Sequence, residues 1–274
     1  MGQGRRRSAV RAILLVLLSA IGLLAQPSSA LPQAMLPAPI LKPGEGLAIA
    51  FDTEVRTYGA ARAEAPIGGL AKLLWLRLEG SEWAAQGVIF RCTGSSSCGL
   101  PKGHGRLSLG RALQVDCNPA FLAWIAESRS RWEKDYGEAI ARIRLEEVFA
   151  PFLGRRLPPG EGLPAFTASW VGDGDLLRAS PLTLLSWLLE PDKPEVISFG
   201  KRHLAGFWME VKELFGKEDW WCKTATAMVP GDPSATSAWA VGGRGPVVLV
   251  FHMPRGKGQP EAQARFREIL GLKL

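Results

Sequence analysis

Three short clusters along the chain contain residue types that could bind or activate a carbonyl-containing ligand. In Pro66–Lys72 a glycine-rich turn opens a helix and places a lysine near its start. Asp116–Phe121 places an asparagine close to an aspartate, and Trp221–Thr226 places a lysine and two threonines on an expected strand. A lysine can take a proton or pair with a carboxylate, and an asparagine can bind a peptide carbonyl. Each cluster alone has a simpler interpretation, because a lysine on a helix usually faces solvent.

Taken together and in this order, the clusters resemble the penicillin-binding transpeptidases, the serine acyl-transferases related to β-lactamases. That family carries S-x-x-K at the start of a helix, S-x-N on a loop and K-T-G on a strand. The corresponding strings here are GLAK at 69–72, DCN at 116–118 and KTA at 223–225. Flanking strings that also resemble the family lie at 104–105, 112–113, 171–177 and 180–182. The resemblance covers roughly residues 48–252.

Each of the three motifs lacks one member. Gly69 stands where the family has its nucleophilic serine, Asp116 where it has the serine of the second motif, and Ala225 where it has glycine. Removing the serine of a serine acyl-transfer site lowers kcat by about 10⁶-fold. The resemblance therefore predicts a catalytically impaired protein. The string Ser198–Lys201 also fits S-x-x-K, but it follows the second motif in the chain, and we interpret it as a coincidence.

The resemblance also implies which groups could still bind a ligand. Lys223 and Thr224 would hold a terminal carboxylate, and Asn118 would bind a peptide carbonyl. The backbone N–H groups of Gly69 and Thr226 stand where the family forms its oxyanion hole. The catalytic-motif positions are Gly69, Lys72, Asp116 and Asn118, and the expected ligand-binding residues are Lys72, Asn118, Lys223, Thr224 and Thr226.

By the family geometry, Asp116 would lie near Lys72 and Lys223, neutralise them and compete with an anionic ligand. The residues leave three interpretations. The first is an impaired domain of the cell envelope that binds peptidoglycan stem peptides or a partner enzyme. The second is an active DD-peptidase or β-lactamase with an unrecognised nucleophile. The third is a scaffold that kept the fold and binds no ligand.

The N-terminus carries the features of an export signal. Four arginines and no acidic residue lie within residues 1–30, which also contain the uncharged run Ala12–Ala25. As a helix this run would reach about 21 Å, short of the hydrocarbon core of a bilayer, which is about 30 Å thick. Small residues up to Ala30 predict a signal peptide over residues 1–30, and an uncleaved anchor is the alternative. We therefore expect a secreted or periplasmic protein of a bacterial cell envelope.

The composition indicates a globular protein and limits its partners. The 274 residues are 47% hydrophobic and 22% charged, with 31 glycines, which excludes a disordered tail, a collagen and a coiled coil. The formal net charge of +7 falls to +3 without residues 1–30, because 29 basic and 26 acidic residues then remain. That excess is too small for nucleic-acid binding. We expect a peptidoglycan peptide or an envelope protein as partner, a membrane only if the N-terminal segment is retained, and no cofactor.

The spacing of apolar residues predicts the elements that must position these groups. Prolines within 31–46 indicate an extended linker, so the transpeptidase-like domain is expected over 47–274. Strands are expected at 48–55, 83–90, 220–229, 237–241 and 247–253, and helices at 69–78, 128–149, 204–215 and 261–270, with another opened by Ser180 and Pro181. This order predicts an α/β (α+β) fold: an antiparallel sheet from both chain ends, flanked by helices, with a helical subdomain inserted at about 100–215, as in β-lactamases and transpeptidases.

The chain has four cysteines, Cys92, Cys98, Cys117 and Cys222. An even number of cysteines in an exported chain suggests disulfides. We expect one between Cys92 and Cys98, which would close a short Gly/Ser loop and restrict the unfolded chain by about 2–3 kcal/mol. Cys117 and Cys222 could pair or stay free. The three histidines, at 104, 203 and 252, lack the spacing of a zinc site, so no metal is expected.

Overall fold

The computed structural model describes residues 39–51, 54–94, 98, 100–153, 168–190, 221–244 and 247–269. Contacts divide the chain into Met1–Pro37 and Ala38–Leu274, and all described residues belong to the second unit. The expected signal segment over 1–30 and the expected helix over 204–215 lie outside the described residues, as does the first half of the expected linker.

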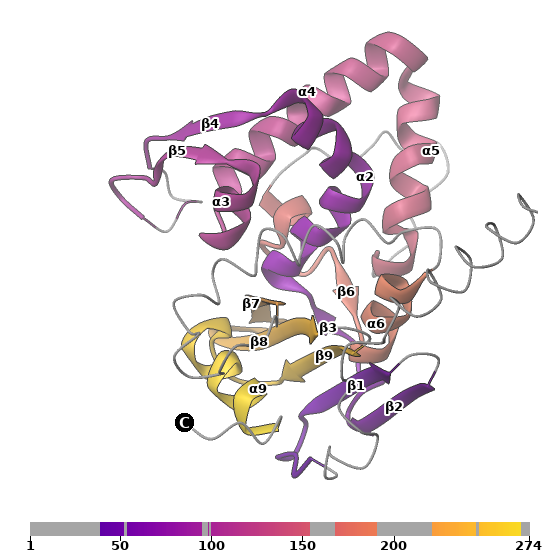
Figure 1. The fold of residues 1–274 in the computed structure, drawn as a ribbon, viewed down its shortest axis with the longest axis vertical. Helices are drawn as coiled ribbons and strands as arrows, with labels where there is room; N and C mark the ends of the chain where they lie inside the picture. Colours follow the sequence, from indigo (N-terminus) through magenta and orange to yellow (C-terminus); the bar gives the residue numbers. More distant parts are fainter. Residues whose placement is uncertain are drawn as a thin grey trace, which may run out of the picture. The chain divides into compact units, whose positions relative to one another are not determined.

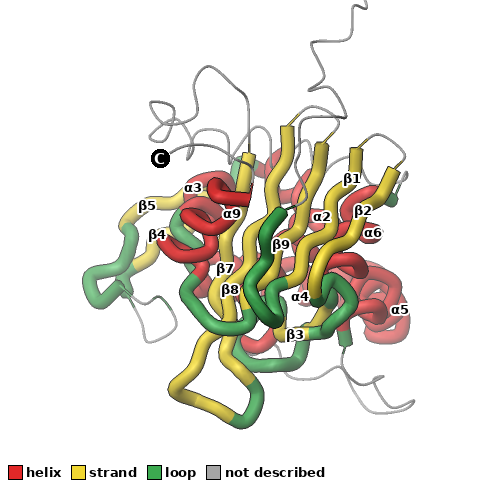
Figure 2. The backbone as a smooth tube through the Cα atoms, turned by 90° about the horizontal axis from the view of Figure 1, so that it is seen from below, coloured by secondary structure: helices red, strands yellow, loops and turns green. Residues whose placement is uncertain are grey.

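A five-stranded antiparallel sheet joins the two ends of the described chain (Figure 2). Its strands, in spatial order, are β2 (Glu54–Gly59), β1 (Gly46–Phe51), β9 (Val247–Met253), β8 (Asp232–Arg244) and β7 (Trp221–Val229). The N-terminal β1 pairs directly with the C-terminal β9, with Ala48 opposite Val250. Nearly all residues of both strands are buried, which explains why they are apolar without alternation. The prediction of an antiparallel sheet built from both chain ends is confirmed.

Between β2 and β7 the chain is mainly helical and lies to one side of the sheet (Figure 1). The elements of this portion are β3 (Ala65–Pro66), the 3-10 turn η2 (Gly68–Leu70), α2 (Ala71–Gln86), β4 (Ile89–Cys92), β5 (Gly105–Ser108), α3 (Leu109–Gln114), α4 (Asn118–Tyr136), α5 (Glu138–Phe149), the 3-10 turns η3 (Ala150–Phe152) and η4 (Ala168–Val171), β6 (Arg178–Ala179) and α6 (Pro181–Leu189). Within the described residues, no helix is both long enough and apolar enough to cross a bilayer.

Helices cover the sheet on both faces. Helix α6 packs against β1 and β9, whereas a π-helical turn, η5 (Gly258–Ala262), lies against β7 and β8. The turn leads into α9 (Gln263–Ile269), so the helix expected over 261–270 is confirmed in position but begins as a π-helical turn. Figure 2 shows α9 in front of the sheet and α2 and α6 behind it.

Two glycines end helices where the apolar pattern continues. The strand expected over 83–90 is wrong, because Trp83 is buried in the last part of α2, which ends at Gly87 in the left-handed conformation (φ 61°). The single helix expected over 128–149 is two helices, because Gly137 (φ 81°) separates α4 from α5. Tyr136, which a single helix would bury, is therefore 58% exposed.

Other predicted boundaries agree more closely. The strand expected over 48–55 ends at Phe51, and β2 begins at Glu54 as its antiparallel neighbour. The predicted cap of α6 is confirmed, because the Ser180 hydroxyl accepts a hydrogen bond from the backbone N–H of Thr183 at 3.1 Å and Pro181 occupies the first turn. Such a cap satisfies a backbone donor that the helix itself cannot.

Glu79 is a buried carboxylate that ties α2 to α4. Its oxygens accept hydrogen bonds from Trp132 Nε1 (3.1 Å), Ser128 Oγ (2.8 Å) and the Arg131 guanidinium. Ser128 Oγ in turn accepts a hydrogen bond from Trp83 Nε1 at 2.9 Å. Glu79 is only 3% exposed, and a charge at such a position is tolerated because it has this many partners. The network fixes α2 relative to α4, and both helices carry motif residues at their N-terminal ends.

Replacing Glu79 by alanine should therefore lower the free energy of unfolding by about 2 kcal/mol, because buried donors of Trp132 and Ser128 lose their acceptor. Glu82→Ala is the matched control: its side chain is 54% exposed and it meets the same Arg131 at 3.6 Å. That control should cost less than about 0.5 kcal/mol. Urea unfolding of both variants measures the difference, and equal losses would contradict the role given to Glu79.

Candidate functional site

The structure brings the three sequence clusters together around one carboxylate. Lys72, in the first turn of α2, donates hydrogen bonds from Nζ to Asp116 Oδ1 (2.9 Å) and Asn118 Oδ1 (2.6 Å). Lys223, on β7, donates to the same Asp116 Oδ1 at 2.9 Å. The Val171 carbonyl oxygen lies 3.4 Å from Lys72 Nζ and completes three acceptors, which match the three donors of an ammonium group. Four of the predicted site residues thus share one site with the main chain of Val171.

A tight turn between α3 and α4 presents Asp116 and Asn118 to the two lysines. Asp116 has a φ of 55° and is the single non-glycine residue with positive φ among the described residues. The turn is held by backbone hydrogen bonds from Asp116 to Leu113 (3.3 Å) and from Cys117 to Ala112 (3.0 Å). Aspartate is one of the few residue types that tolerate this left-handed conformation. The conformation turns the carboxylate and the Asn118 amide in the same direction.

Burial and charge set the ionisation of the three groups. The Lys72 side chain is 0% exposed and that of Lys223 is 5% exposed. Burial lowers the pKa of Lys72; Asp116 opposes that shift and Lys223 adds to it. Burial would raise the pKa of Asp116, but Lys223 and Lys72 hold it well below its ordinary value. Because the Asp116 side chain is 42% exposed, solvent screens part of this attraction.

The low pKa of Asp116 has a definite sign for stability. A carboxylate whose pKa is lower in the folded state stabilises the fold above its unfolded pKa of about 4. This contribution is lost as pH falls through the lower value of the folded state. At neutral pH the carboxylate is therefore ionised and balances one of the two lysines.

The Asp116 carboxylate also fills the space next to Gly69. A Cβ on Gly69 would lie 2.5 and 2.8 Å from the two carboxylate oxygens of Asp116, closer than real Cβ atoms approach other groups. A serine side chain at position 69 cannot occupy this space while Asp116 keeps its conformation. Gly172 (φ +97°) closes the other side, because a Cβ there would collide with the Gly68 carbonyl. The departures GLAK and DCN are thus two halves of one fit.

The third motif is only partly arranged as predicted. Because side chains alternate along a strand, Lys223 shares one face of β7 with Ala225, and Thr224 shares the other with Thr226. The Thr226 hydroxyl accepts a hydrogen bond from the Gly258 backbone N–H at 2.8 Å. It is therefore engaged by η5. A carboxylate held jointly by Lys223 and Thr224 would have to bind around the edge of β7, which is an outer strand of the sheet.

The expected disulfide between Cys92 and Cys98 is not formed. Their sulfur atoms are 3.4 Å apart, whereas a disulfide bond is about 2.05 Å long, and all four described cysteines are free thiols. Cys92 and Cys98 instead lie beside His104 and Cys117. The sequence reasoning missed this group because it compared each spacing with short zinc motifs. The available signal was three cysteines and one histidine within 92–117.

The fit between Asp116 and Gly69 should appear as an energetic coupling. Gly69→Ser should cost about 2 kcal/mol through the steric conflict, and Asp116→Ser should also destabilise, because both lysines lose their shared anion. In the double variant the steric part disappears, so the loss should be smaller than the sum by about 1–2 kcal/mol.

A double-mutant cycle measured by urea unfolding determines this coupling. Gly80→Ser, tested with the same Asp116→Ser change, is the matched control. A Cβ on Gly80 meets Leu76 at an ordinary 3.5 Å. Its effect should be additive, and additive behaviour of Gly69→Ser as well would contradict the proposed fit.

The sequence matches no family model and no curated protein. Among solved structures, the chain is similar to the penicillin-binding protein PonA1 from Mycobacterium tuberculosis, with a TM-score of 0.56 and 11% identity over 82% of this chain and 75% of that one. For FUS-1 (OXA-85), a class D β-lactamase from Fusobacterium nucleatum subsp. polymorphum, the values are 0.55 and 14% over 83% and 91%. For penicillin-binding protein 2B from Streptococcus pneumoniae (strain R6) they are 0.57 and 11% over 83% and 53%. The fold of this chain is that of the penicillin-binding transpeptidases and β-lactamases.

Proposed function

We propose that this protein is a catalytically inactive, penicillin-binding-like domain of the bacterial cell envelope that binds peptidoglycan stem peptides without acylation. One observation carries the proposal: the carboxylate of Asp116 occupies the space that a serine side chain at position 69 would need. The site therefore keeps the lysines and the asparagine of the resembled motifs and lacks their nucleophile.

Acyl transfer by this site would require a hydroxyl that a base can activate. In the described part of the chain, the hydrogen-bond acceptors of Lys72 Nζ are Asp116, Asn118 and Val171, and none of these is a hydroxyl. Ser198, whose string also fits S-x-x-K, lies outside the described residues. The active-enzyme alternative therefore has no support from the contacts of Lys72.

The charges of the site favour weak binding of a terminal carboxylate. Two lysines face one aspartate, so one positive charge is left unbalanced. A peptide carboxylate would bind beside the Asp116 carboxylate or displace it, and the repulsion between the two anions weakens binding. The Lys223 side chain, only 5% exposed, lies under this competition. We infer a ligand held by charge and hydrogen bonds, with an affinity that Asp116 limits.

The N-terminal segment supports the envelope location in this proposal. Residues 1–30 have the arginines, the uncharged run and the small residues of an export signal. A partner protein is the second candidate for what the domain binds. A structure of similar fold, described as a peptidoglycan synthase complex, has a TM-score of 0.56 and 16% identity over 79% of this chain and 48% of that one.

Fluorescent penicillin should leave the wild-type chain without covalent label, because residue 69 has no hydroxyl. The triple variant Gly69→Ser, Asp116→Ser, Ala225→Gly restores all three motifs and should gain a label that survives denaturation. Asp116→Ser alone is the matched control and should stay unlabelled. In-gel fluorescence beside an active penicillin-binding protein makes the comparison.

Two outcomes of this labelling would count against the proposal. Covalent label on the wild-type chain would show a nucleophile that the motifs did not reveal, and its loss in Ser198→Ala would identify that nucleophile. An inert but folded triple variant would contradict the alignment of the three motifs.

An acyl-D-Ala-D-Ala peptide should bind the wild-type chain saturably and weakly in a calorimetric titration. Asp116→Asn removes the competing anion and should tighten binding about tenfold. Lys223→Met should weaken it by at least as much, whereas Lys134→Ala, at an exposed position of α4, should leave it unchanged. If Asp116→Asn also binds no peptide, the peptide proposal fails and a protein partner becomes the better explanation.

A further inference from the structure

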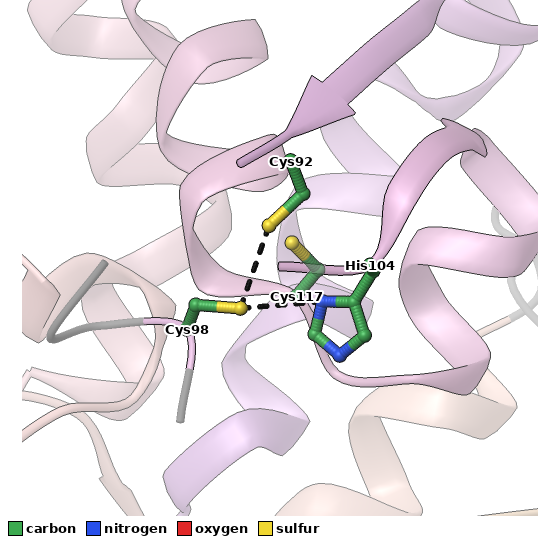
Figure 3. A group of neighbouring side chains, drawn as sticks. All are labelled: Cys92, Cys98, His104 and Cys117. Carbon is green, nitrogen blue, oxygen red and sulfur yellow. Dashed lines mark hydrogen bonds between the residues drawn. The ribbon is translucent and has the colours of Figure 1, made fainter. Parts of the chain in front are cut away.

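Four side chains outside the lysine site converge on one point. They come from the end of β4 (Cys92), the loop after it (Cys98), the residue before β5 (His104) and the residue before α4 (Cys117). Figure 3 shows the three sulfur atoms and the imidazole directed toward one another. These atoms all lie within 4.8 Å of each other. The Cys92–Cys98 sulfur distance is 3.4 Å, and Cys98 Sγ lies 3.3 Å from His104 Nδ1.

These distances fit a tetrahedral metal better than they fit a covalent bond. With Zn–S bonds of about 2.3 Å and a Zn–N bond of about 2.0 Å, tetrahedral angles separate two sulfurs by about 3.8 Å and sulfur from nitrogen by about 3.5 Å. A disulfide would need about 2.05 Å between two sulfurs. It would also use only two of the four groups, whereas one metal ion would use them all. Cys222, on β7, does not belong to the group.

Backbone amides are already directed at the three sulfurs. Cys92 Sγ accepts hydrogen bonds from the backbone N–H groups of Gly94 and His104, Cys98 Sγ from that of Leu100, and Cys117 Sγ from that of Ala120. Amide donors around ligand atoms orient them and stabilise their negative charge in thiolate metal sites. Cys92 and Cys117 are buried, while Cys98 and His104 are partly exposed, which leaves a path by which an ion could enter.

We propose that Cys92, Cys98, His104 and Cys117 bind one zinc ion in a tetrahedral, structural site. Three thiolates and one imidazole are a typical ligand set for zinc, and four protein ligands leave no open position for catalysis. This site is separate from the proposed peptide binding and does not depend on it.

The zinc site would fix the turn that serves the lysine site. Cys117 lies directly between Asp116 and Asn118, so a metal bound to its sulfur would anchor this turn to the β4–β5 hairpin. The short string DCN would then join two sites, with its outer residues on Lys72 and its middle residue on the metal. Loss of the metal should therefore loosen the turn as well as the hairpin.

The test uses the full exported chain, untagged and purified under reducing conditions. Mass spectrometry of metals should find about one zinc per chain, and replacement by Co²⁺ should give the intense visible bands of tetrahedral cobalt–thiolate coordination. Cys92→Ser and His104→Ala should each lose most of the metal. His104→Cys should retain it, because four thiolates also bind zinc. Cys222→Ser is the matched control and should keep one zinc per chain.

Removing zinc with a chelator should lower the Tm of the wild-type chain by more than about 5 °C. The proposal is overturned if the reduced wild-type chain holds no zinc and gives no tetrahedral cobalt spectrum. It is also overturned if peptide mapping of the chain from the periplasm finds Cys92 and Cys98 joined as a disulfide. The cobalt spectrum of the wild-type chain decides the question even if the variants fail to fold.

Discussion

The Asp116 carboxylate between two lysine ammonium groups is the interaction on which the site depends. It is the common partner of Lys72, which is fully buried, and of Lys223, which is nearly so. Without it the two cations would face each other in a poorly solvated place, a costly arrangement. Because these groups come from α2, the α3–α4 turn and β7, the same contact holds the helical portion against the edge of the sheet. The Asp116 carboxylate thus performs a structural task in the place where the resembled family performs catalysis.

The order of the motifs was enough to predict the fold and the meeting of the lysines with Asn118. Local patterns were also enough for the sheet strands and for the Ser180 cap, because these depend on neighbouring residues. The fit of Asp116 against Gly69 could not be predicted from strings. The sequence shows two separate departures from a motif, and only the coordinates show that one side chain occupies the space left by the other.

The remaining errors have similar causes. The apolar spacing across 128–149 continues through Gly137, but this residue adopts a conformation that a helix cannot contain. For the cysteines, parity and loop length favoured a disulfide, whereas the hairpin and the start of α4 bring a histidine and a third cysteine to the same point. A ligand set gathered from a strand end, a loop, a strand start and a helix N-terminus has no short sequence signature.

The reciprocal fit at position 69 also bears on how such a protein can evolve. A serine arriving first would collide with the aspartate, and loss of the aspartate first would leave like charges opposed. Each single step toward the motif of the resembled enzymes therefore crosses a fitness valley, and only the joint change avoids it. Sign epistasis of this kind acts as a ratchet, so selection can refine the non-catalytic role of this domain while a return to catalysis stays closed.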